Sequence, residues 1–200
     1  MLSAEELHFN KCKFLSDNFF SSLCPGKTVL EVGCFDGHIT EVIEQHRPRS
    51  LTLFEASKIA VRNVQQRFSH ATVIHGDMHK DLSKVGPVDL AVVLGVIYHS
   101  HAPLMVLEEL VNCCNPCDIL IDNLAPVFRW NLETPNLPGM RYTTSDQKTC
   151  NMLININDEM MVIAFENLGY KLVKKLCYPE NARAPHLPVL HFTQSIRNVS

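Results

Sequence analysis

Short apolar runs alternate with helix-spaced patterns along most of the chain, and this alternation restricts its fold more than any other feature. Five runs carry the β-branched and aliphatic residues typical of buried strands, at residues 28–32, 51–54, 71–74, 88–94 and 119–121. Helices between successive strands act as crossover connections, which place the strands parallel in one sheet. The pattern therefore predicts an α/β fold with a mainly parallel sheet and helices on both faces.

The expected helices have recognisable starts. Ser3 and Glu6 have the spacing of a capping box, which predicts an N-terminal helix within residues 1–25. Gly37 precedes a helical pattern that reaches about residue 45, and Ser57 is expected to cap the next helix. Further helices are expected over residues 103–114, where proline is the first residue, and over residues 158–168.

The last third of the chain departs from the alternation. Residues 124–150 lose periodicity and contain three prolines, so we expect an irregular insertion on the active face. Residues 170–176 and 189–195 have strand character without a helix between them. They are expected to form an antiparallel hairpin at one edge of the sheet.

Composition excludes several classes of protein. A length of 200 residues suits one domain spanning residues 1–200. The 18 basic and 21 acidic residues give a formal charge of −3, which favours a small molecule over a nucleic acid as partner. The longest apolar run, residues 90–98, is too short to span a bilayer, and the acidic start does not resemble a secretory signal. We expect no membrane association and a cytoplasmic location.

The eight cysteines do not suggest a disulfide framework or a metal site. The chain is not small, and the adjacent pair Cys113 and Cys114 is poorly suited to a bridge. Reduced thiols are therefore expected. Cys117 lies close to that pair, but no second pair of suitable spacing follows, so no metal site is expected.

The turn after the first strand contains glycines and acids together. It reads Glu31-Val32-Gly33-Cys34-Phe35-Asp36-Gly37 and leads into the first crossover helix. A dinucleotide fingerprint would place three glycines around a pyrophosphate, whereas this turn has two. Its two carboxylates would repel a diphosphate and suit a ligand that carries positive charge.

This turn resembles the cofactor loop of class I S-adenosylmethionine-dependent methyltransferases, in which an acid precedes a glycine, often a cysteine, and a later glycine. Here those residues are Glu31, Gly33, Cys34 and Gly37, while Phe35 stands where that loop more commonly has another glycine. The resemblance implies a Rossmann-like, seven-stranded sheet with its last strand antiparallel. It also implies that residues 31–37 hold the methionine part of S-adenosylmethionine.

Two further strand ends carry acids in the order that the resemblance requires. Glu55 follows the second strand, where an acid can accept hydrogen bonds from both ribose hydroxyls. The resemblance implies that Asp77 accepts the adenine amino group and that Met78 packs on the ring. Ala56, beside Glu55, and Leu94, at the end of the fourth strand, are expected to line the same site.

The loop after the fourth strand supplies the candidate catalytic residues. It reads Gly95-Val96-Ile97-Tyr98-His99, with Ala102-Pro103-Leu104 after it, and resembles the tRNA wobble-uridine carboxymethyl-transferring enzymes and their methyltransferase relatives. Tyr98 and His99 leave the sheet where the transferable methyl group is expected. His99 is either a general base, since its ordinary pKa is near neutrality, or a residue that shapes the pocket.

The acceptor side of the site is less defined. Asp122 and Asn123 follow the fifth strand and either contact substrate or cap the loop. Arg141, in the expected insertion, can pair with an anionic acceptor. We select Asn123 and Arg141 as the candidate substrate-binding residues.

Three functions remain to be distinguished. The first is a methyltransferase that uses S-adenosylmethionine, with a small metabolite favoured as acceptor and a tRNA base second. The second is a methyltransferase-like binding module without catalytic activity. The third, a nucleotide-dependent oxidoreductase, is disfavoured by the missing third glycine and by the acids in the loop.

Overall fold

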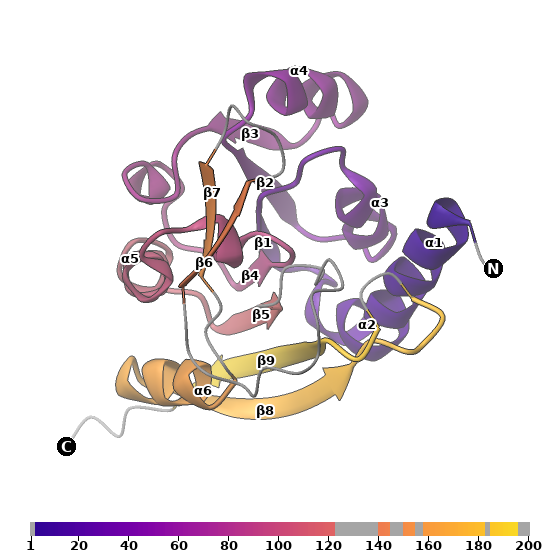
Figure 1. Cartoon of the computed structure of the whole chain (residues 1–200). Coiled ribbons are helices and arrows are strands. Elements are labelled where there is room, and N and C mark those ends of the chain that lie inside the picture. Colours follow the sequence, from indigo (N-terminus) through magenta and orange to yellow (C-terminus); the bar gives the residue numbers. More distant parts are fainter. Residues whose placement is uncertain (1–2, 123–139, 145–149, 155–157, 183–184, 196–200) are drawn as a thin grey trace.

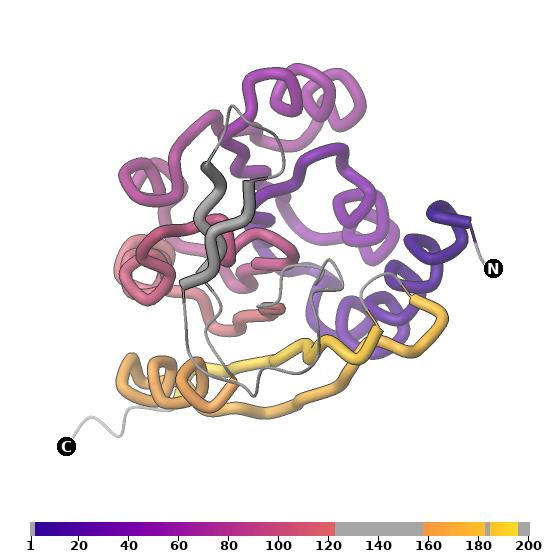
Figure 2. Tube along the Cα trace, viewed as in Figure 1, coloured from indigo at the N-terminus to yellow at the C-terminus, as the bar shows by residue number. Residues whose placement is uncertain are grey.

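A seven-stranded mixed sheet forms the centre of the protein, as the computed structural model shows (Figures 1 and 2). The structure describes residues 3–122, 140–144, 150–154, 158–182 and 185–195, with the two short segments 140–144 and 150–154 described by their backbone alone. The strand order is β3-β2-β1-β4-β5-β9-β8. The predicted fold class is confirmed.

Five parallel strands make up the larger part of this sheet. They are β1 (Thr28–Val32), β2 (Ser50–Glu55), β3 (Thr72–His75), β4 (Leu90–Val93) and β5 (Asp118–Asp122). Every residue of β4 is buried, as expected for a parallel strand with helices over both faces. β9 (Pro188–Gln194) pairs antiparallel with both β5 and β8 (Tyr170–Cys177), which gives the predicted edge hairpin.

Helices cover both faces of the sheet because successive strand residues point to opposite sides. On one face, Val29 and Leu53 pack with α1 (Ala4–Leu15), α3 (His38–Gln45) and α4 (Lys58–Arg67). On the other face, Leu30 and Phe54 pack with α5 (Pro103–Cys114) and α6 (Asp158–Asn167). Two short 3₁₀ segments, η2 (Leu82–Lys84) and η3 (Ile97–His99), follow β3 and β4.

The N-terminal helix begins as predicted and then changes its winding. The Ser3 and Glu6 side chains each accept a hydrogen bond from the other residue's backbone, which completes the capping box. After α1 the chain forms a π-helix, η1 (Ser16–Phe20), and a last turn, α2 (Ser21–Leu23). The Lys174 ammonium on β8 donates a 2.7 Å hydrogen bond to the Asn18 carbonyl, so the edge strand is tied to this irregular turn.

The expected irregular insertion at residues 124–150 is partly wrong. β6 (Met140–Thr144) and β7 (Cys150–Ile154) form a two-stranded antiparallel sheet. The prolines earlier in this region hid two runs that contain aromatic and β-branched residues, which favour strands. β7 lies beside η3, while residues 124–139 and 145–149 are outside the described part of the chain.

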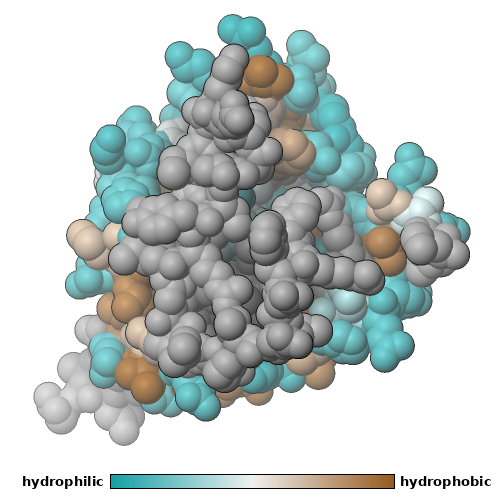
Figure 3. All heavy atoms as spheres, in the orientation of Figure 1, coloured by the Kyte–Doolittle hydropathy of each residue, from teal (hydrophilic) through white to brown (hydrophobic). Residues whose placement is uncertain are grey.

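In the described ranges, no helix is both long and apolar enough to cross a membrane. Figure 3 shows mainly hydrophilic side chains over α4, with hydrophobic ones near α5 and α6. The exposed hydrophobic residues of α5 and α6 are Leu104, Met105, Met160 and Ile163.

Candidate active site

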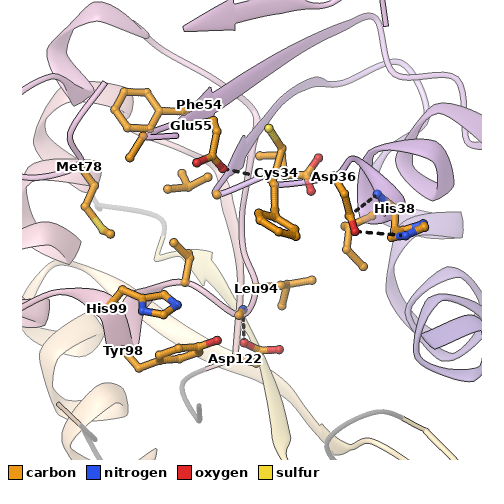
Figure 4. A pocket seen from close by; sticks show the side chains of 18 of the residues that line it. Cys34, Asp36, His38, Phe54, Glu55, Met78, Leu94, Tyr98, His99 and Asp122 are labelled. Carbon is orange, nitrogen blue, oxygen red and sulfur yellow. Dashed lines mark hydrogen bonds and ion pairs between the residues drawn. The ribbon is translucent and has the colours of Figure 1, made fainter. Parts of the chain in front are cut away.

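A cavity of about 500 Å³ opens at the carboxyl ends of the parallel strands (Figure 4). It lies where the strand order reverses between β1 and β4, the place at which α/β sheets bind ligands. Its volume is within the usual range for sites that take small molecules or cofactors. The predicted site residues that line it are Glu31, Gly33, Cys34, Phe35, Glu55, Ala56, Met78, Leu94, Tyr98 and His99.

Four predicted residues stand apart from that lining. Gly37 and Asp77 are not among the residues that line the cavity. Asn123 lies outside the described residues, and Arg141 is in β6, where the backbone alone is described. The assignments of Asn123 and Arg141 to the acceptor therefore stay predictions.

Left-handed backbone conformations shape the loop after β1. Gly33 has φ +76° and Gly37 has φ +82°, values that suit glycine. A Cβ at Gly33 would lie 2.6 Å from Val96 Cγ2, so the loop after β1 approaches the loop after β4 closely. A Cβ at Gly37 would overlap the Phe68 ring of the segment after α4. Both glycines are thus needed for the path of the loop.

Glu31 presents a buried carboxyl group to the cavity from the end of β1. Its side chain is 4% exposed, and Thr40 Oγ1 donates a 2.6 Å hydrogen bond to Oε2. Burial raises the pKa of Glu31 to about 7, because the charged form is poorly solvated, while the Thr40 hydrogen bond acts in the opposite direction. A cation placed beside this carboxyl would favour its ionised form.

Glu55 links the cofactor-type loop to the start of α4. Phe35 N donates to its Oε2 at 3.0 Å, and Ser57 N donates to its Oε1 at 2.7 Å. Figure 4 shows the Glu55 carboxylate pointing into the cavity opposite Tyr98 and His99. Because each carboxylate oxygen can accept more than one hydrogen bond, Glu55 keeps capacity for a ligand hydroxyl.

Asp77 and Met78 lie in the turn after β3, and their side chains have different surroundings. The Asp77 carboxylate accepts a 2.9 Å hydrogen bond from His79 N, and its Oδ2 lies 3.6 Å from Lys80 Nζ. The hydrogen bond from His79 is the main reason that the pKa of Asp77 is lowered. Met78 lines the cavity, whereas the Asp77 carboxylate stabilises its own turn.

Tyr98 and His99 lie on η3, directly after β4, and form the side of the cavity opposite Glu55 (Figure 4). Their ring centroids are 4.3 Å apart. Burial lowers the pKa of His99, since the imidazolium is poorly solvated there, and the charge of Glu55 partly opposes this. The lowered pKa favours a neutral imidazole near pH 7, the form that can accept a proton.

The structure adds a buried polar network that the sequence did not predict. The Asp122 carboxylate, 2% exposed, accepts hydrogen bonds from Gly95 N at 2.5 Å, Tyr178 OH at 2.9 Å and Lys11 Nζ at 3.3 Å. The position of Asp122 at the end of a buried strand was a usable signal. Lys11 and Tyr178 gave none, because each meets Asp122 across a long sequence separation.

The cavity is acidic on balance. Glu31, Asp36, Glu55 and Asp122 line it, while Lys11 is the one lysine or arginine among the described residues that do so. Its lining therefore fits an organic cation that also carries hydroxyl groups, as S-adenosylmethionine does. Across the described ranges, no three side chains of the metal-ligating kinds gather at one point.

Comparisons with known proteins agree with this fold. The family model described as "Methyltransferase domain" matches residues 6–144. A search of curated proteins gives no match.

Solved structures with the same fold share little sequence with this chain. Magnesium protoporphyrin IX methyltransferase from Synechocystis PCC 6803, with bound S-adenosylmethionine, has TM-score 0.68 and 13% identity over 96% of this chain and 83% of that chain. N-methyltransferase NodS from Bradyrhizobium japonicum WM9 has TM-score 0.66 and 18% identity over 94% and 96%. A chain in the complex of the Haloferax volcanii Trm112 methyltransferase activator with a methyltransferase has TM-score 0.69 and 13% identity over 98% and 93%.

These matches do not support the resemblance to the tRNA wobble-uridine enzymes, since the family model is described only as a methyltransferase domain, and magnesium protoporphyrin IX methyltransferase and NodS are not named as enzymes of that branch. The family model covers more than half of the chain, and the fold and the cavity agree with it. The chain therefore belongs to the methyltransferase-domain family and is a methyltransferase that depends on S-adenosylmethionine.

Proposed function

We propose that this enzyme transfers the methyl group of S-adenosylmethionine to a small-molecule acceptor. The observation that carries the proposal is the charge of the cavity. Lys11 is the one lysine or arginine in the described lining, and its ammonium is already paired with Asp122 at 3.3 Å. A site for a tRNA base would need cations for the adjoining phosphates, so a tRNA acceptor is second.

The cofactor is assigned to the side of the cavity formed by β1, β2 and the turn after β3. In this proposal Glu31 and the loop through Gly37 hold the methionine part, Glu55 accepts the ribose hydroxyls and Met78 packs on the adenine. Asp77 would reach the adenine amino group with the carboxylate that also accepts from His79 N. Bound S-adenosylmethionine supplies an activated methyl group, and the protein holds it in place and excludes water.

The cofactor assignment is tested by calorimetric titration with S-adenosylhomocysteine, with NADH in a parallel cell. Wild-type protein is expected to bind the first and not the second. Glu55→Ala is expected to lose at least tenfold in affinity, about 1.4 kcal/mol, since the ribose hydroxyls lose their acceptor. Glu108→Ala, on the exposed side of α5, is the control. An unchanged affinity in Glu55→Ala would remove the ribose assignment, and heat from NADH alone would remove the cofactor.

The catalytic side is assigned to Tyr98 and His99. A neutral His99 would accept the proton of an acceptor that is protonated at working pH, and Tyr98 would position that acceptor. His99→Asn separates this role from a shaping role. Loss of a base is expected to lower kcat about 100-fold or more with the affinity for S-adenosylhomocysteine unchanged. If the variant instead loses that affinity and keeps kcat, His99 only shapes the pocket.

The acceptor class is tested by supplying labelled S-adenosylmethionine with a pool of small metabolites or with total tRNA. Label transferred to the metabolite pool supports the proposal. Transfer to tRNA, reduced steeply by added salt, would replace it with the second acceptor class. Binding of S-adenosylhomocysteine without transfer to either pool would favour the inactive binding module.

We also propose that residues 1–200 act as one domain in the cytoplasm. Support for one domain comes from β8 and β9, which lie beyond the family match yet complete the sheet beside β5. The seven cysteines in the described part of the chain are free thiols, which suits a reducing compartment. A single calorimetric unfolding transition and the same transition with and without reductant are expected. Two separate transitions would contradict the one-domain proposal.

A further inference from the structure

Phe35 combines an exposed aromatic side chain with a left-handed backbone conformation. Its side chain is 67% exposed, and of the exposed large hydrophobic residues in the described ranges it is the one that lines the cavity. Its backbone has φ +46°, a left-handed conformation that is unusual and strained for a bulky residue. A strained, exposed aromatic residue in a binding site indicates a role with the ligand.

The backbone on both sides of the ring is fixed. Phe35 N donates a 3.0 Å hydrogen bond to Glu55 Oε2, and the Asp36 carbonyl accepts a hydrogen bond from the Arg67 guanidinium. These two hydrogen bonds hold the backbone of the loop, and the Phe35 side chain stays 67% exposed at the cavity. A ligand in the cavity would cover the exposed ring and remove it from water.

The charge of the surroundings indicates what kind of ligand the ring meets. Glu31, Asp36 and Glu55 line the cavity together with Phe35, and Glu55 Oε2 accepts the hydrogen bond from Phe35 N, so positive charge is drawn there. The face of an aromatic ring also attracts a cation. Resting on the function proposed above, we propose that Phe35 contacts the sulfonium centre of S-adenosylmethionine and so favours the methyl donor over the product.

This preference follows from the charge change in the reaction. When the S–CH₃ bond breaks and the acceptor takes the methyl group, the sulfur keeps the electron pair and becomes a neutral thioether. A ring that attracts the cation loses that attraction in the product, whereas its apolar contact remains. Phe35 would therefore help S-adenosylmethionine to compete with S-adenosylhomocysteine for the site.

The test compares the affinities for S-adenosylmethionine and S-adenosylhomocysteine in Phe35→Leu by calorimetry. Leucine keeps an apolar contact and removes the aromatic face. We expect the affinity for S-adenosylmethionine to fall about fivefold and that for S-adenosylhomocysteine to change by less than about twofold. The matched control is Phe9→Leu, because Phe9 is 66% exposed on α1 and does not line the cavity. It is expected to change neither affinity.

A second variant tests the strained backbone. Phe35→Gly should melt at a higher temperature than Phe35→Leu, since glycine adopts φ +46° without strain, and should bind S-adenosylmethionine more weakly than wild type. Equal losses for both ligands in Phe35→Leu, or no loss for either, would overturn the inference while the proposed function stands. Wild-type protein that binds neither ligand would overturn both.

Discussion

At the scale of single residues, Gly33 is a position in the loop after β1 where both the backbone conformation and the available space require glycine. It combines φ +76° with a Cβ position 2.6 Å from Val96 Cγ2. Gly33→Ala is expected to lower the free energy of unfolding by about 2–4 kcal/mol, from the left-handed backbone and from the overlap together. Gly86→Ala is the control, because Gly86 has φ +78° with open space around its Cβ position, and should cost about 1 kcal/mol. Urea unfolding of both variants measures the difference, and equal losses would contradict the overlap.

Glu31 makes stability depend on pH in a direction opposite to that of a salt-bridged carboxylate. Its pKa is raised to about 7 in the folded protein, against 4.5 as its ordinary value. Between these values the folded protein holds the proton that the unfolded chain has released, so stability is highest below pH 4.5 for this group and is lost as pH rises through 7. The loss is at most about 3 kcal/mol.

Glu31→Gln should remove this contribution. The difference in the free energy of unfolding between wild type and Glu31→Gln, measured by urea unfolding from pH 5 to pH 8, is expected to change in favour of the variant as pH rises. Thr40→Val, which removes the hydrogen bond to Glu31, should move the change to higher pH. A pH-independent difference would show that Glu31 is not protonated in the folded protein.

The sequence was enough to predict which acids at strand ends would lie near the cavity. It was not enough to predict the hydrogen-bond partners that come from distant parts of the chain. Glu31 and Glu55 line the cavity because each lies near the carboxyl end of a buried strand, and parallel strands end at one edge. Asp77 also follows a strand, yet its carboxylate accepts a hydrogen bond from His79 N in its own turn. The spacing of residues in the sequence does not predict whether such a carboxylate bonds to its own turn or to a ligand. Lys11 meets Asp122 from 111 residues away.

At the scale of elements, the ion pair between Lys11 and Asp122 joins α1 to the end of β5, in addition to the apolar contacts of the helix. Lys11 is 13% exposed and its ammonium lies 3.3 Å from the Asp122 carboxylate and 4.9 Å from the centre of the Tyr178 ring. Lys11→Met should lower the free energy of unfolding by about 1–3 kcal/mol, because a buried carboxylate loses its cation but keeps two neutral donors.

Lys13→Met is the control for this prediction on the same helix. The Lys13–Asp17 pair is exposed, 62% and 54% for the two side chains, so its loss should change the free energy of unfolding by about 0.5 kcal/mol or less. Hydrogen exchange in α1 should rise in the Lys11 variant and stay unchanged in the Lys13 variant. Equal behaviour of the two would mean that α1 is held by its apolar face alone.

The elements that prediction missed are those formed by context. The π-helix η1 follows a regular amphipathic pattern in the sequence, and its Asn18 carbonyl is satisfied by Lys174 from the far edge of the sheet. β6 and β7 stabilise each other as a hairpin within a proline-containing region, where local composition favours a loop. Contacts with other segments, which the local pattern does not show, contribute to both structures.

At the scale of the whole molecule, the order of the strands determines which part of the sheet contacts a bound ligand. The reversal of strand order between β1 and β4 places the cavity over the centre of the parallel part, and the antiparallel strands β9 and β8 lie beyond β5 (Figure 1). Alternation of strands and helices was enough to predict the parallel part. It was enough for the site's location too, since loops from neighbouring parallel strands meet at one edge.

Ligand binding is therefore expected to stabilise the whole protein against unfolding and to slow hydrogen exchange mainly at the edge of the sheet that carries the cavity. At a concentration 100 times its dissociation constant, S-adenosylhomocysteine should raise the free energy of unfolding by about 2.7 kcal/mol, a rise in Tm of roughly 5–10 °C. Hydrogen exchange should slow most in the loops after β1, β2 and β4, which line the cavity, and least in β8. Protection centred on β8 would place the ligand at the other edge of the sheet, and an unchanged Tm would mean that the cavity does not bind it.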